Sequence, residues 1–195
     1  MAAPEVAEHM QERLERLYRR SPKQKFELRR LFEKPGQRGN YYVFEMIETS
    51  GSENTWIGAN AMAVFSPDLR LPHAQIMGRM IFDGKTASWM VSMAEKVVNW
   101  AGSQGGYTRF QLTNYPDIDQ KLIVMVEDEA EARAILTPER LRRLTWLAES
   151  EKWSGILCDG NCFVLERKTT PRKPNLEIDY ASLLQDTTSA WNMLR

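Results

Sequence analysis

The chain has 195 residues, of which 43% are hydrophobic and 27% charged, and its 26 basic and 26 acidic side chains leave no net charge. This is the composition of an ordinary globular protein that is long enough to bury a core. The charge balance disfavours a dedicated nucleic-acid-binding protein, because such proteins carry a basic excess. With no apolar run of transmembrane length, no apolar secretory signal and two cysteines, we expect a cytoplasmic protein.

The first segment of the chain is predicted to be an amphipathic helix over residues 4–20. We expect residues 1–22 to form a helical extension, because a helix of this length is marginal in water without tertiary contacts. The apolar stripe would then dock on a partner protein or on a second copy of the chain, and a solvated surface helix is the alternative. The predicted contact residues are Met10, Leu14, Leu17 and Tyr18, with Arg13, Arg16 and Arg20 at the rim.

Alternating apolar residues and turn residues predict a strand-rich region after this helix. Residues 26–32 fit a strand and a helix equally well, whereas residues 41–48 and 54–65 read as two strands of a hairpin. Gly58 indicates a bulge in the second of these strands. The segment 35–40 is predicted to be a loop that lacks the spacing of a phosphate-binding loop. A further strand is expected over Leu69–Ile76, after a turn at Ser66-Pro67-Asp68.

The middle of the chain combines a predicted helix with two predicted strands. Trp and Met recur at helical spacing over residues 86–101, and strands are expected at 107–112 and 120–126. Between those strands, Asp117 and Asp119 would share one face of an extended segment. Two carboxylates can bind a divalent cation, but no third ligand is identifiable, so a solvated turn is favoured. His73 likewise has no ligand neighbours at metal spacing, and a structural or surface role is expected for it.

Two consecutive helices are predicted by their capping residues. Asp128 is placed to cap a short helix over residues 128–136, whose acidic first turn suits the helix dipole. Thr137 is the expected N-cap of a second helix that runs to about Ser150, with Pro138 in its first position. Leu136 and Leu141 have the spacing of a hydrophobic staple across that helix start.

The C-terminal part is predicted to be a hairpin over residues 152–167 followed by a helix over 175–194. Asp159-Gly160 is the expected turn of the hairpin, and Asn175 the expected cap of the helix. Cys158 and Cys162 flank the turn, so they are either cross-strand neighbours close enough for a disulfide or free structural thiols. The free thiols are favoured because a second cysteine pair for zinc is lacking and a reducing compartment is expected.

Four stretches of the chain carry a recognisable pattern. They are YYVFEMIETSG at 41–51, FSPDLRLP at 65–72, YPDIDQK at 115–121 with Asp128, Glu129 and Arg133 after it, and the hairpin 158–167. In order and spacing they resemble a widespread family of bacterial proteins of no established activity, from about Phe26 to the C-terminus. The resemblance implies a single domain and supplies no catalytic residue. In that family membrane-spanning segments often precede the domain, where this sequence has a charged helix.

Together these patterns predict an α+β protein with an antiparallel sheet, helices packed on it and one domain over residues 23–195. The leading hypothesis for function is a non-catalytic protein-interaction or structural module, without a cofactor or metal and without nucleic acid as a partner. It follows from the lack of a nucleophile–base set, a nucleotide loop or a ligand cluster in the sequence. The alternative is a small-ligand binder or an enzyme with a pocket near Asp117, Asp119 and Arg133.

Overall fold

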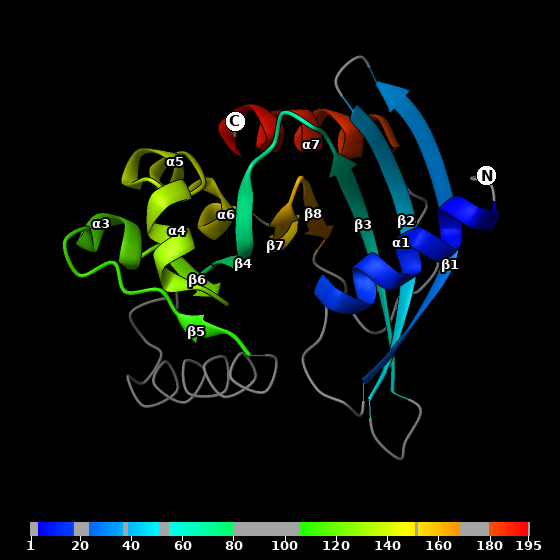
Figure 1. The fold of residues 1–195 in the computed structure, drawn as a ribbon, viewed down its shortest axis with the longest axis horizontal. Helices are drawn as coiled ribbons and strands as arrows, with labels where there is room; N and C mark the ends of the chain where they lie inside the picture. The colour runs from blue at the N-terminus through cyan, green and yellow to red at the C-terminus, as the bar shows by residue number, and fades with distance from the viewer. Residues whose placement is uncertain are drawn as a thin grey trace.

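The computed structural model describes residues 4–17, 24–36, 39–50, 55–79, 106–150, 152–167 and 180–194. Within these residues an eight-stranded antiparallel sheet has the order β1-β2-β3-β8-β7-β4-β6-β5, and helices lie on both of its faces (Figure 1). The predicted α+β class is therefore confirmed. The strands are β1 Gln24–Gly36, β2 Gly39–Ser50, β3 Thr55–Phe65, β4 Leu71–Gly78, β5 Thr108–Arg109, β6 Leu122–Val126, β7 Trp153–Gly160 and β8 Cys162–Arg167.

Alternation along the strands sends side chains to two apolar layers, one on each face of the sheet. In β3, Val64 belongs to the layer that also contains Trp191 and Leu194 of α7 (Tyr180–Leu194), whereas the next residue, Phe65, packs with the layer of α1 (Pro4–Leu17). We call these two sides of the sheet the α7 face and the α1 face. Burial of both faces explains why β6 is apolar at every position, and why β7 and β8 carry apolar runs at Ile156–Cys158 and Cys162–Leu165.

The first helix contributes to the core of the domain. Met10, Leu14 and Leu17 are at most 2% exposed and pack on the α1 face against β1, β2, β7 and β8. The sequence predicts residues 1–22 as an extension outside a domain that begins at residue 23. In the structure, three of the four apolar residues predicted to contact a partner, Met10, Leu14 and Leu17, are buried against the chain's own sheet.

The short helices between β5 and β7 cover the α7 face. The Asp128 carboxylate accepts hydrogen bonds from the backbone N–H groups of Ala130 and Glu131 at 2.8 and 3.0 Å. The Thr137 hydroxyl accepts one from the backbone N–H group of Arg140 at 3.3 Å. Both predicted helix caps are therefore confirmed. The predicted helix to Ser150 is divided into two, which changes its length but leaves Leu141, Leu144 and Leu147 buried. These helices are α3 Pro116–Asp119, α4 Glu129–Ile135, α5 Pro138–Arg143 and α6 Trp146–Glu149.

Strand pairing corrects several local predictions. The ladder of β1 and β2 continues to the pair Gly36–Gly39, so the predicted loop 35–40 is much tighter. The register of β2 and β3 is regular through Gly58, and the bulge lies instead in β1 between Leu28 and Arg30. Regular pairing persists at Gly58 because a glycine can occupy an extended strand without a register change. The segment of Asp117 and Asp119 is helical and not extended, since Pro116 begins α3 there.

The hairpin β7–β8 is confirmed, with its turn one residue later than predicted. Asp159 pairs with Cys162, which leaves Gly160 and Asn161 as the two turn residues. Gly160 has a φ of 59°, a left-handed conformation that glycine adopts readily at the first central position of such a turn. The turn is fixed to the rest of the sheet by Ser66, whose N–H donates to the carbonyl of Asn161 at 2.9 Å.

Some predictions concern residues outside those that the structure describes. They are the helix over 86–101, the cap at Asn175, most of the hairpin tip at 49–53, and Tyr18 and Arg20 of the first helix. None of the helices in the described part of the chain is long and apolar enough to cross a membrane.

Candidate binding pocket beside the first helix

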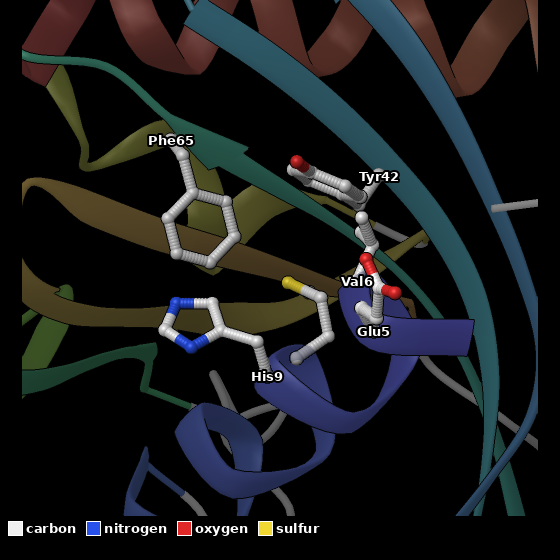
Figure 2. Close-up of a pocket in the computed structure, with 6 residues that line it drawn as sticks. Glu5, Val6, His9, Tyr42 and Phe65 are labelled. Carbon is white, nitrogen blue, oxygen red and sulfur yellow. The ribbon is translucent and has the colours of Figure 1, made fainter. Parts of the chain in front are cut away.

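A pocket of about 330 Å³ opens between α1 and the sheet. Figure 2 shows the side chains of α1 and those of β2 and β3 facing one another across it. Its walls are mostly apolar carbon, and its polar residues, Glu5 and His9, are exposed on the helix. The lining residues are Glu5, Val6, His9, Met10, Tyr42 and Phe65. The volume lies at the lower end of the range for ligand pockets, which suits a single bulky apolar group.

The helix contributes two i,i+4 pairs to this pocket. Glu5 lies one turn before His9, and Val6 lies one turn before Met10, so each pair stacks on the same side of α1. Met10 is also buried in the core beneath, whereas Val6 is half-buried. The pocket therefore begins where the buried face of the helix passes into its solvent-exposed face.

The sheet contributes two aromatic rings that hold each other in place. The rings of Tyr42 and Phe65 meet edge to face, with their centroids 5.3 Å apart. The Tyr42 hydroxyl donates to Glu33 Oε1 at 2.9 Å, and Asn40 Nδ2 donates to the same carboxylate at 3.0 Å and to the Tyr42 hydroxyl at 3.2 Å. Burial raises the pKa of Tyr42 above its ordinary value, so the phenol stays neutral and its proton is committed to Glu33.

Arg13 packs on Phe65, one of the residues that line the pocket. Its guanidinium lies 4.7 Å from the centroid of Phe65 and donates to Asn161 Oδ1 at 2.7 Å. Its Nε is 3.7 Å from Oδ2 of the buried Asp159, within ion-pair distance. Arg13 was predicted at the rim of a partner contact, and in the structure it ties α1 to the β7–β8 turn.

A second polar cluster continues from Asp159 away from the pocket. His73 Nε2 is 2.7 Å from Asp159 Oδ1, and His73 Nδ1 is 3.3 Å from Glu127 Oε2. His73 therefore lies between two carboxylates, that of Asp159 on β7 and that of Glu127 just after β6. This bridge between β4, β7 and the end of β6 agrees with the structural role predicted for His73.

The two cysteines are free and buried, and they lie on opposite faces of the sheet. Cys158 packs in the layer of α7, and Cys162 packs in the layer of α1. The disulfide alternative is excluded in this fold because side chains that point to opposite faces cannot be bridged. Burial raises the pKa of the Cys158 thiol to about 12 and that of Cys162 further, so neither is a thiolate nucleophile at neutral pH.

The residues of the alternative site have separate partners. Asp117 accepts from Nε of Arg142 at 3.1 Å, and Asp119 accepts from Arg109 at 3.3 Å. Arg133 pairs with Glu129 of its own helix and lies over the ring of Phe110. Among the described residues no group of three or more His, Cys, Asp or Glu side chains is arranged to hold a metal ion.

Comparisons with protein-family models, with curated proteins and with solved structures find no match to this chain. The pocket itself was not predicted from the sequence, although the two apolar patterns that form it were. The helical stripe containing Met10 and the alternation of β2 were both visible, but neither shows which surface the helix covers.

Proposed function

We propose that the protein is a non-catalytic interaction module that binds a partner protein by receiving one of the partner's bulky apolar side chains in the pocket beside α1. The observation that carries this proposal is the pocket itself, whose walls are Val6, Met10, Tyr42 and Phe65. An apolar side chain inserted there would leave water for a preformed surface, which is how anchor residues contribute most of the affinity of an interface.

The state of the surrounding polar groups supports binding more than catalysis. The Tyr42 hydroxyl is engaged by Glu33 and Asn40, and Arg13 is engaged by Asn161 and Asp159. Side chains whose contacts are made within the protein in this way shape the pocket wall, although Arg13 Nε and Asp159 Oδ2 face each other without a hydrogen bond. The alternative near Asp117, Asp119 and Arg133 has weaker support, because each of these side chains is held in an ion pair with a different partner.

The test is selection of peptides from a phage-displayed random library on the full chain, followed by calorimetry with the synthetic peptides. Val6→Trp and His9→Trp fill the pocket from two positions, and each should weaken binding by about tenfold or more. Ala134→Trp adds the same side chain at an exposed position of α4, on the other face of the sheet, and should leave the affinity unchanged.

Two results would overturn the proposal. The first is a selection that yields no binding peptide, and the second is a set of peptides that bind both pocket-filled variants as tightly as the wild type. Circular dichroism on each variant checks that α1 remains folded. His9 is exposed, so His9→Trp keeps the test valid even if Val6→Trp loosens the helix.

A further inference from the structure

We propose, resting on the function above, that the partner presents its apolar side chain from a basic segment, with lysines or arginines on one or both sides of it. The inference comes from the charges that border the pocket. Glu5, Glu8, Glu12 and Glu15 are all exposed, and their spacing of three and four residues aligns them along one side of α1. We call these four residues the acidic stripe.

The acidic stripe adjoins the pocket. Glu5 is itself a lining residue, and Glu12 lies three residues after His9, which lines the pocket from the same side of the helix. A chain that inserts a side chain between α1 and β3 would therefore place its neighbouring residues beside Glu5, with the rest of the acidic stripe further around the helix. Basic side chains at those positions would meet opposite charge, and acidic ones would meet like charge.

The opposite wall of the pocket is also negative. Glu33 lies behind the Tyr42 hydroxyl, half-buried, and accepts hydrogen bonds from Tyr42 and Asn40. Because the Glu33 carboxylate is partly shielded from solvent, dissolved salt screens its charge less than that of a fully exposed acid. A carboxylate thus lines the pocket on the helix side, and another lies behind Tyr42 on the sheet side.

The basic groups of α1 do not cancel this field at the pocket. Arg13 is already within ion-pair distance of the buried Asp159. Arg16 is exposed one turn after Glu12, so it offsets the C-terminal end of the acidic stripe and not its end at Glu5. Because the whole chain has no net charge, the negative border is a local feature and not a reflection of overall acidity.

The experiment compares two double variants that remove the same total charge. Glu5→Gln with Glu8→Gln neutralises the border of the pocket, whereas Glu131→Gln with Glu149→Gln neutralises two exposed acids on α4 and α6. The peptides selected above should be enriched in lysine and arginine beside one bulky apolar residue. The first double variant should weaken their binding about three- to tenfold, and the second should not change it.

Salt and peptide variants complete the test. Raising the salt concentration should weaken binding to the wild type more than binding to the Glu5→Gln, Glu8→Gln variant. Replacing the peptide's basic residues by glutamine should remove that difference. If the selected peptides are neutral or acidic, or if the two double variants behave alike, the basic-segment proposal is wrong.

The outcomes separate this inference from the proposed function. The selected peptides could bind Val6→Trp and His9→Trp more weakly than wild type but bind the glutamate variants with unchanged affinity. This result would support the pocket as a binding site and overturn only the proposal of a basic segment. Self-association of the wild type that the pocket-filled variants abolish, measured by light scattering, would identify the occupant as a second copy of the chain and overturn the partner proposed here.

Discussion

Cys158 and Cys162 show at the scale of single residues how strand geometry controls chemistry. Their separation by three residues invites a disulfide, yet an odd number of intervening residues across a two-residue turn places them on opposite faces. The side chains enter different apolar layers and are both fully buried. Residue spacing alone could not settle this, because it does not identify which residues form the turn.

We expect both thiols to be unreactive in the folded protein. Burial raises the pKa of Cys158 to about 12, so very little thiolate exists at neutral or mildly alkaline pH, and a reagent has no access to the sulfur. A thiol-specific chromogenic reagent should therefore detect no cysteine in native protein and both after denaturation without reductant. Rapid labelling of native protein would show that the hairpin is not packed as described.

Ionisation of Tyr107 should lower the free energy of unfolding at alkaline pH. Burial is the main cause that raises its pKa from 10.0 to about 12 in the folded state. Between these values the unfolded chain binds fewer protons than the folded chain, so raising the pH favours unfolding. The stabilisation associated with the neutral phenol is full below pH 10 and is lost as the pH rises through about 12.

Urea denaturation at a series of alkaline pH values measures this effect. Tyr107→Phe should reduce the loss of stability across that range, because its ring stays buried without an ionisable group. Tyr115→Phe is the matched control, since Tyr115 is 37% exposed. Equal pH slopes in the wild type and Tyr107→Phe would contradict the assignment.

At the scale of elements, helix starts could be predicted from the sequence more reliably than helix partners. Asp128 and Thr137 identify two helix starts, because a side-chain acceptor beside unpaired N–H groups is a local property. The stripe of Met10, Leu14 and Leu17 identifies the buried face of α1 for a similar reason. The stripe does not reveal whether that face contacts a partner or the chain's own sheet. Either surface would bury the same three side chains, so both produce the same sequence pattern.

The two helix caps should each contribute measurably to stability. Asp128→Ala and Thr137→Ala should each lower the free energy of unfolding by about 1 kcal/mol, because an acceptor for N-terminal N–H groups is lost. Asp128→Asn and Thr137→Ser retain an acceptor and should be nearly neutral. Denaturation midpoints that do not separate alanine from the conservative variants would show that these side chains do not cap α4 and α5.

The packing of α1 leads to a different expectation from that of a detachable extension. Leu14→Ala should lower the free energy of unfolding by about 2–5 kcal/mol, since it removes a fully buried side chain from the α1 face. Glu15→Ala, at the next and exposed position, should change it little. If Leu14→Ala is as stable as wild type and only association falls, the helix docks on a partner as the sequence alone suggested.

At the scale of the whole molecule, the strand order is what the sequence could least predict. Strands that are neighbours in the chain pair as expected in the hairpins β2–β3 and β7–β8, because their turns are local, whereas the pairing of β1 with β2 was not predicted. The pairing of β3 with β8 and of β4 with β7 joins residues far apart in sequence. The pocket depends on the pairing of β3 with β8, because this pairing places Phe65 on β3 beside Cys162 on β8.

The placement of β7 and β8 between β3 and β4 has a consequence for synthesis on the ribosome. β3 and β4 are consecutive in the chain, but each pairs in the finished sheet with a strand of the later hairpin. Until about residue 167 has left the exit tunnel, both strands present open edges and uncovered apolar faces. The nascent chain therefore carries an aggregation-prone surface until the β7–β8 hairpin emerges, and the sheet can close only then.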